Sequence, residues 1–414
     1  MYQFKKALLS GEEDVLLREA LALVEAHGPN GLSLRSLAQK AGISPSLLNY
    51  RYGSRNDLIR RAFEHGHKLD QAHWDAREGT FDRLSATQED LPSLALAVVT
   101  DMVTRTRQTS LVYWLFLTAS EREPDLSPAA PGWTRLAQAF WARRLAEAGL
   151  DPELAAPYAA GLNGAVRIGL LVPGNLQLMT WLNDVVLRLN QRVLQKAPSS
   201  PGDSAARCAI EQIALSRPRR MTQSRTDTPS RIVEAASTLI LSHGPDALTH
   251  RLIAEASGIS LSSLTHHFGS LAEIQLHAFE RIYDTARQQS VADIPSGTSI
   301  EQLCHDVLPT LFRKARARGR ENLAMDEIMI ASSRKPETAG LAGGLMAMTG
   351  QTSTNLLQAF ASEFPTLDRL DGQIFRFIMI GLSEQSREFA AQEQDLWMSQ
   401  KCAHFLRTCR GQDL

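Results

Sequence analysis

The amino-acid sequence repeats itself at a constant distance along the chain, and this repeat limits what the chain can fold into. Four short segments of the first half recur in the second half, all at the offset that separates His27 from His243. The pairs are His27-Gly28-Pro29 with His243-Gly244-Pro245, Gly42-Ile43-Ser44 with Gly258-Ile259-Ser260, Gly53-Ser54 with Gly269-Ser270, and Ala62-Phe63-Glu64 with Ala278-Phe279-Glu280. Further on, Arg122-Glu123-Pro124 resembles Arg334-Lys335-Pro336 at a slightly shorter offset. Because solenoid repeats have periods of roughly 20–50 residues, this pattern indicates a duplication of two units of about 200 residues.

Both units show the periodicity of helices. Leu16, Ala20, Leu23 and Val24 follow a spacing of about 3.6 residues, and the segment from Ile232 to Ile240 does the same. The second unit begins at Thr228-Pro229, where we expect Thr228 to cap a helix that starts at Pro229. No segment alternates apolar and polar residues as a strand would. The fold class is therefore predicted to be all-α.

A segment rich in Pro, Ser and Gly separates the two units. Residues 196–203 have the composition of a linker, and a short helix is predicted over 205–216. A basic arm follows, with arginines at Arg217, Arg219, Arg220 and Arg225. This arm is either a DNA contact along the backbone or minor groove, or a linker made soluble by its charge.

Composition excludes several classes of protein. The formal net charge of -1 is too small for a protein that coats nucleic acid or anionic membranes through bulk charge, although a local basic face remains compatible with it. The chain has four cysteines, no signal peptide and no apolar stretch of about 18 residues, so we expect a cytoplasmic protein without a membrane partner. No nucleophile elbow, phosphate-binding loop or zinc-protease motif occurs, and we predict no enzyme, no cofactor and no metal site.

The repeated segments contain a motif of two short helices joined by a turn. In Leu37–Leu48, Gly42 can adopt the left-handed conformation that reverses the chain, and Ser44 can cap a helix whose first residue is Pro45. The second copy keeps Ala254, Gly258 and Ser260 at the matching positions. Capping boxes at Ser54/Asp57 and Ser270/Glu273 begin the helix after each motif. This pattern predicts a helix-turn-helix, whose second helix enters a DNA major groove; two structural hairpins without DNA are the alternative.

The segment from Gly31 to Gly42, continued through Tyr52-Gly53-Ser54-Arg55, resembles the N-terminal domain of the tetracycline-repressor (TetR) family. The resemblance covers about 14–66 and 229–282. It implies two tandem all-α units, each with a helix-turn-helix domain and a helical ligand-binding and dimerisation domain, which together form an intramolecular pseudo-dimer. The expected division is a first DNA-binding head (1–66), a first regulatory half (67–196), a linker with the basic arm (197–227), a second head (228–282) and a second regulatory half (283–414).

The resemblance also implies the DNA-contacting residues of the first head. They are Arg35, then Pro45, Ser46, Leu47, Asn49, Tyr50 and Arg51 on the recognition helix, and Arg55 at the phosphate-contacting position. Between Ser33 and Arg61 there are six basic residues and a single acidic one, Asp57. Such a patch can neutralise several phosphates and make DNA affinity fall with salt.

The second head departs from the family pattern. Leu271 stands at the usual lysine position and Thr265 at that of a tyrosine, and between Thr249 and His277 the only arginine is Arg251. The candidate DNA contacts are Arg251, Ser262, Ser263, Thr265, His266 and His267. We therefore predict weaker binding with a different base preference, and a head that no longer binds DNA is the alternative.

The regulatory halves differ in their candidate ligand-binding residues. Aromatic side chains dominate the first half and methionines the second, and both types suit an adaptable apolar pocket, although they suit a plain core equally well. The candidates are Tyr113, Trp114, Phe116, Trp133, Met325, Met329 and Phe360. The last long helices of each half, over about 152–194 and 367–406, are expected to pack in a four-helix arrangement.

The sequence thus predicts a ligand-responsive transcriptional regulator of the repressor type. Two unlike heads would bind an asymmetric operator in double-stranded DNA, and a small apolar or amphipathic effector would release it. The alternative is one working head, with the second half serving as a ligand sensor or a protein-partner module.

Overall fold

The structure is a computed structural model in which every regular element of the described residues is a helix, so the all-α prediction is confirmed. It describes residues 2–81, 86–123, 125–126, 130–196, 203–215, 227–289, 299–317, 319–334, 336–358 and 367–410.

The first unit begins with the helices of its head and continues into the helices below. The head comprises α1 (Tyr2–His27), η1 (Pro29–Gly31), α2 (Leu34–Ala41), α3 (Pro45–Tyr52) and the start of α4 (Arg55–Phe81). Below the head, in the part of the first unit expected to be its regulatory half, lie the rest of α4, α5 (Leu91–Val103), α6 (Arg107–Arg122), α7 (Ala130–Glu147), η3 (Pro152–Leu154), α8 (Ala155–Leu171) and α9 (Leu176–Val193).

The second unit repeats this order after a short connecting helix, α10 (Ala205–Leu215). Its head comprises α11 (Thr228–His243), η4 (Pro245–Ala247), α12 (His250–Ser257), α13 (Leu261–His267) and the start of α14 (Leu271–Gln289). Below it lie α15 (Ile300–Gln302), the π-helical turn η5 (Leu303–Val307), α16 (Leu308–Ala317), α17 (Gly319–Ser333), α18 (Pro336–Met348), α19 (Gln351–Gln358), α20 (Arg369–Gln385), η6 (Ser386–Glu388) and α21 (Ala391–Arg410).

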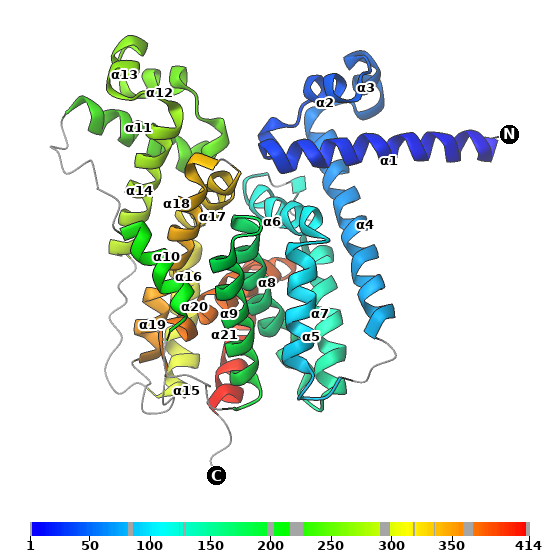
Figure 1. Cartoon of the computed structure of the whole chain (residues 1–414), viewed down its shortest axis with the longest axis vertical. Helices are drawn as coiled ribbons and strands as arrows, with labels where there is room; N and C mark the ends of the chain where they lie inside the picture. Colours follow the sequence, from blue (N-terminus) through cyan, green and yellow to red (C-terminus); the bar gives the residue numbers. More distant parts are fainter. Residues whose placement is uncertain are drawn as a thin grey trace.

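The two heads lie at the same end of the molecule, with α2 and α3 beside each other on one side and α12 and α13 on the other (Figure 1). Helices α4 and α14 each run without a break from a head into the regulatory half below it. Each head is therefore joined to the helices below it by one continuous helix.

The start of the second unit differs from the sequence prediction by one residue. The N-cap is Asp227, whose side chain accepts a hydrogen bond from the backbone N–H of Ser230 at 2.9 Å. Thr228 and Pro229 are the first two helical residues, so the prediction that Thr228 caps the helix was wrong. Aspartate is as good a cap as threonine, so the helix can begin one residue earlier than expected. Proline is tolerated throughout the first turn, so Pro229 also fits as the second helical residue.

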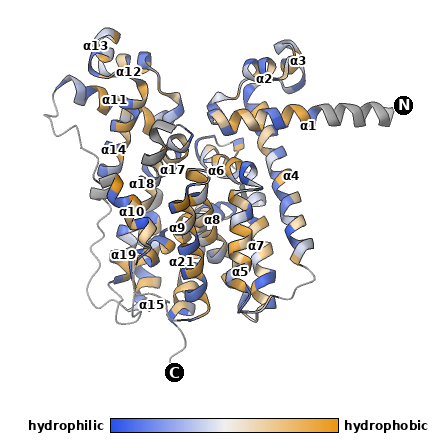
Figure 2. Cartoon of the chain, in the orientation of Figure 1, coloured by the Kyte–Doolittle hydropathy of each residue, from blue (hydrophilic) through white to orange (hydrophobic). Residues whose placement is uncertain are grey.

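The halves meet where α8 and α9 pack against α20 and α21. These helices are the ones that the sequence analysis expected to meet, and Figure 2 shows apolar residues concentrated along α8 and α9. A Cβ atom at Gly164 of α8 would lie 2.1 Å from Cγ of Phe377 of α20, so the phenyl ring occupies the space that only glycine leaves. Arg188 Nη1 donates to Asp368 and Asp371 at 2.8 Å, which adds a buried ion pair to the apolar contact.

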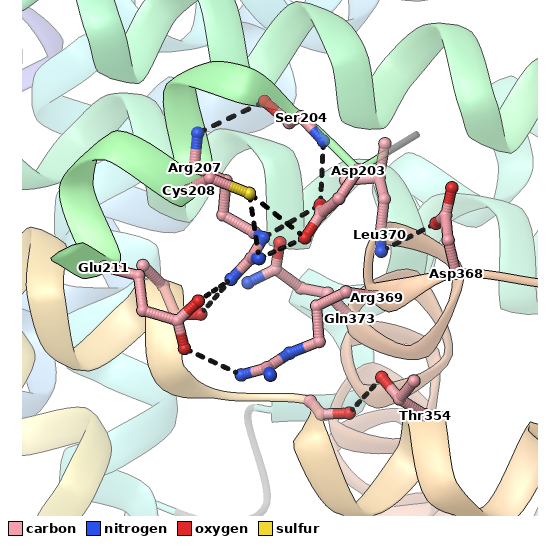
Figure 3. A network of polar contacts seen from close by, with 12 residues as sticks. Asp203, Ser204, Arg207, Cys208, Glu211, Thr354, Asp368, Arg369, Leu370 and Gln373 are labelled. Atoms are coloured by element: carbon pink, nitrogen blue, oxygen red, sulfur yellow. Dashed lines mark hydrogen bonds and ion pairs between the residues drawn. The ribbon is translucent and has the colours of Figure 1, made fainter. Parts of the chain in front are cut away.

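Helix α10, which the sequence places in the linker, is bound to the body of the protein (Figure 3). Arg207 pairs with Glu211 on its own helix at 2.8 Å and donates to the carbonyl oxygen of Ala347 on α18. Glu211 in turn accepts from Arg369 of α20 at 3.2 Å, and Ser204 donates to Asp184 of α9. The chain segment between the units is thus fixed at α10 by both halves.

The described helices include none with the length and apolarity that crossing a bilayer would require.

Candidate nucleic-acid interface

Side-chain caps hold both helices of the first head's helix-turn-helix, and the Ser44 cap is the one that the sequence predicts. Ser33 caps α2 by accepting from Ser36 N, and Ser44 caps α3 by accepting from Leu47 N at 3.3 Å. Between the helices Gly42 has φ 67°, in the left-handed region that favours glycine. Leu48 of α3 is fully buried in the core of the head, so the helix is anchored by one side and presents the other.

The outer side of α3 carries most of the side chains expected to contact DNA. Tyr50 is 90% exposed and Leu47 is 51% exposed, which is unusual for large apolar or aromatic residues. Pro45, Ser46 and Asn49 are also exposed, and Arg51 is half-buried. An exposed helix with these side chains has the shape and surface that major-groove binding requires.

The basic residues of the first head differ in their environment. Arg35 on α2 is exposed. Arg55, in contrast, donates from Nε to the carbonyl oxygen of Leu32 at 3.0 Å and from Nη2 to that of Pro29 at 2.9 Å. Its guanidinium therefore ties α4 to the turn around η1, a role that sequence analysis missed.

Three other basic residues of the predicted patch pair with carboxylates. Lys40 lies 3.4 Å from Glu19, Arg61 lies 3.0 Å from Glu13, and Arg60 pairs with Asp57. Two of these acidic partners belong to α1, outside the window in which the charges were counted. The charge that the first head presents is therefore smaller than the count from 33 to 61 implies.

The second head repeats the geometry with different side chains. Thr249 and Ser260 cap α12 and α13, Gly258 between them has φ 65°, and Leu264 is fully buried. The expected DNA-contacting residues Arg251, Ser262, Thr265, His266 and His267 are exposed, and Ser263 is half-buried. The rings of His266 and His267 lie 5.4 Å apart on the last turn of α13. The arginines of the basic arm lie outside the described residues.

The outer side of the second head also carries two leucines that the sequence analysis did not select. Leu261 is 52% exposed at the first position of α13, where the first head has Pro45, and Leu252 of α12 is exposed as well. The sequence could have identified Leu261 as a candidate DNA contact, because the constant offset of the repeat aligns it with Pro45. Apolar side chains at such positions can contact a thymine methyl group.

The aromatic candidates for ligand binding pack against one another in the first regulatory half. The ring of Trp133 lies 5.4 Å from that of Tyr113 and 5.0 Å from that of Phe116. Trp114 instead faces the guanidinium of Arg167 at 5.2 Å. Met325 and Met329 are buried on α17 of the second half, whereas Phe360 lies outside the described residues.

A buried carboxylate accompanies this aromatic group. Asp70 of α4 accepts from Trp133 Nε1 at 2.9 Å and from Trp74 Nε1 at 3.3 Å. Burial raises the pKa of Asp70, and the two indole donors only partly oppose that shift. Asp70 could not be identified from the sequence, because a single aspartate on a predicted helix carries no sign of burial.

A cleft that opens to solvent lies where both heads meet the helices below them. Its lining comes from η1 and α6 of the first unit and from α11, η4 and α17 of the second. Of the candidate ligand-binding residues within the described part of the chain, none lines it. Its polar residues include Arg122, Glu327, Asp246 and Arg334.

Comparison with known proteins agrees with the repeated motif. The family model of bacterial regulatory proteins, tetR family, matches at two places, residues 16–62 and residues 232–276. Each match begins in the first helix of a head, includes both helices of the motif and ends in the helix that leaves it. No curated protein matches the chain. The two matches identify two tandem helix-turn-helix domains in this chain that are similar to those of bacterial regulatory proteins of the tetR family.

Proposed function

We propose that the protein is a ligand-responsive transcriptional repressor that binds an asymmetric operator with two unlike heads. The observation that carries the proposal is the difference between two exposed recognition helices on one chain. Tyr50 and Arg51 of α3 correspond in the repeat to His266 and His267 of α13, so the two heads offer different donors to base edges. Unlike donors read unlike bases, and we expect two different half-sites.

We further propose that the two units form an intramolecular pseudo-dimer, divided into heads and regulatory halves as the sequence analysis expects. The packing of α8 and α9 against α20 and α21 supports this, since it joins the units through their last long helices. One chain would then supply both heads for one operator and would act in the cytoplasm, where the DNA is. Fusion also removes the constraint of identical half-sites that a two-fold homodimer carries.

Regulation would follow from a ligand that binds two head arrangements unequally. A ligand shifts such an equilibrium only by the difference between its affinities for the two states. The continuous helices α4 and α14 support a direct path from the regulatory halves to the heads. An apolar or amphipathic effector that favours the arrangement unsuited to DNA would act as an inducer.

The experiment compares head variants on DNA fragments selected by the wild-type protein. Alanine at Arg251, His266 and His267 should weaken binding and remove protection of one half-site, while alanine at Asn49, Tyr50 and Arg51 should remove protection of the other. A matched control is alanine at Glu255, an exposed residue of α12 outside the candidate contacts. If the second-head variant bound as tightly as wild type, with an unchanged footprint, the single-head alternative would replace this proposal.

A further inference from the structure

The cleft between the two heads contains the two arginines that the repeat places at matching positions. Arg122 ends α6 of the first unit, and its counterpart Arg334 follows α17 of the second. Both side chains line the cleft, which is also lined by η1 of the first head and η4 of the second. A molecule bound here would touch both heads and both regulatory halves.

Arg122 is fully occupied by partners across the cleft. Its Nε and Nη2 donate to the two carboxylate oxygens of Glu327 at 2.5 and 2.6 Å. Its Nη1 and Nη2 also donate to carbonyl oxygens at the end of α11, those of Ser242 at 3.0 Å and Ile240 at 3.2 Å. This arginine is therefore a fixed support of the second head and offers a ligand little.

Arg334, in contrast to Arg122, has a partner within the described part of the chain for only one of its two terminal nitrogens. Its side chain is 10% exposed, and its Nη2 donates to Asp246 of η4 at 2.6 Å. Its Nη1 is buried and lacks a hydrogen-bond partner among the described residues. A Cβ atom at Gly28 of the first head would lie 2.6 Å from this Nη1, so the arginine sits between the heads. A buried guanidinium nitrogen without an acceptor is a costly feature that an acceptor would relieve.

The partner of Arg334 is the more exposed member of the pair. The side chain of Asp246 is 24% exposed on a short surface turn, so it can leave for water, while Arg334 is confined by its burial. A carboxylate with two oxygens can accept from both Nη1 and Nη2, which Asp246 does not do here. Leu115, Ala119 and Ile330 supply apolar surface in the same cleft.

We propose that this cleft binds a small carboxylate with an apolar body, and that the ligand carboxylate displaces Asp246 from Arg334. The ligand carboxylate accepts from both terminal nitrogens of Arg334, and its apolar body covers the leucine, alanine and isoleucine. Asp246 then turns to solvent, and the second head loses its ion pair to Arg334 at the end of α17. The other ionisable groups of the lining are Glu123, His243 and the Arg122–Glu327 pair, and they keep their present places.

When Asp246 leaves Arg334, only the second head loses an ion pair. At the position of Asp246 the repeat places Asn30 in the first head, which has no charge to pair with an arginine. The carboxylate should therefore lower affinity for the half-site of the second head more than for that of the first. This consequence rests on the proposed function, whereas the binding site itself does not.

The test is calorimetric titration of the full-length protein with benzoate, and with benzamide as its uncharged analogue. Wild type should bind benzoate weakly and benzamide not at all. Asp246→Asn should bind benzoate about tenfold more tightly, because the charged competitor is gone, and Arg334→Gln should lose binding. The matched control Arg369→Gln removes an arginine that pairs with Glu211 outside the cleft and should behave as wild type.

Three results would overturn the proposal: no benzoate binding by wild type and Asp246→Asn, equal affinity in these two proteins, or unchanged affinity in a folded Arg334→Gln. Thermal unfolding establishes whether each variant is folded. If Arg334→Gln does not fold, the comparison of benzoate affinity between wild type and Asp246→Asn still tests the proposal. Because the titration contains no DNA, its failure is separate from failure of DNA binding. A second titration, of half-site DNA with and without benzoate, should show the larger loss of affinity at the site of the second head.

Discussion

Arginines of the first head separate into those held within the domain and those presented outside it. Arg55 donates to backbone carbonyl oxygens of the turn around η1, so we assign it a positioning role in addition to its expected place near phosphate. Arg60 pairs with Asp57, whereas Arg35 is exposed at the first turn of α2. The salt dependence of binding should reflect these differences, because each released counterion corresponds to one phosphate contact.

We expect Arg35→Ala to weaken binding to all DNA sequences alike and to lower the slope of log affinity against log salt by about 1. Arg60→Ala is the matched control, because its guanidinium already faces a carboxylate, and its slope should stay near that of wild type. Fluorescence anisotropy at several salt concentrations measures both slopes. Equal slopes for the two variants would contradict the assignment of Arg35 to the DNA contact.

The buried carboxyl group of Asp70 should make the stability of the protein depend on pH. Burial raises the pKa of this carboxyl in the folded protein above its unfolded value of about 3.9, so the folded state binds the proton more tightly. The free energy of unfolding should therefore fall as pH rises from the unfolded pKa through the folded one. Asp70→Asn keeps the acceptor for Trp133 and Trp74 and should lack this fall, so that it gains stability over wild type as pH rises.

Urea unfolding at a series of pH values measures this effect. Asp90→Asn is a control of opposite sign, because hydrogen bonds from Thr87 lower the pKa of Asp90 and its contribution is lost as pH falls. If wild type and Asp70→Asn showed parallel pH profiles, Asp70 would not be the titrating group.

At the scale of elements, the helix-turn-helix was predictable because its signals are local. Gly42, Ser44 and Gly258 act within a few residues of themselves, and the structure gives each the predicted conformation or cap. The pairing of Lys40 and Arg61 with α1 was not predictable, since it depends on how α1 crosses α2 and α4. The packing of α10 against both halves was also not predictable, because the linker composition of the segments around a helix does not indicate what the helix packs against.

The contact between α8 and α20 gives a prediction for the packing of the two halves. Gly164→Ala places a methyl group 2.1 Å from Cγ of Phe377, and we expect it to destabilise the protein by about 1–3 kcal/mol. Adding Phe377→Leu should recover part of the loss, because the smaller side chain leaves room for the methyl group.

Urea unfolding of the two single variants and the double variant measures this coupling. Gly79→Ala in α4 is the control, since a Cβ atom there meets no described atom within 4 Å. Additive effects of Gly164→Ala and Phe377→Leu would show that the two residues do not compete for the same space.

At the scale of the whole molecule, one chain holds two unlike heads on a joined pair of regulatory halves. The heads lie at one end (Figure 1), and Arg122 and Arg334 tie the second head to the core beneath it. The internal repeat predicted the two units, and the fold class followed from helical periodicity. The cleft could not be predicted, because it is assembled from segments of both units whose proximity depends on the packing of both halves.

A footprint of the purified protein on the DNA upstream of its own gene shows whether both heads bind DNA. Native mass spectrometry of the same complex gives the number of bound chains. We predict that a single chain protects two half-sites of different sequence, spaced by a whole number of helical turns of about 10.5 base pairs. Protection of a palindrome by two chains, or of one half-site by one chain, would contradict the account of two unlike working heads.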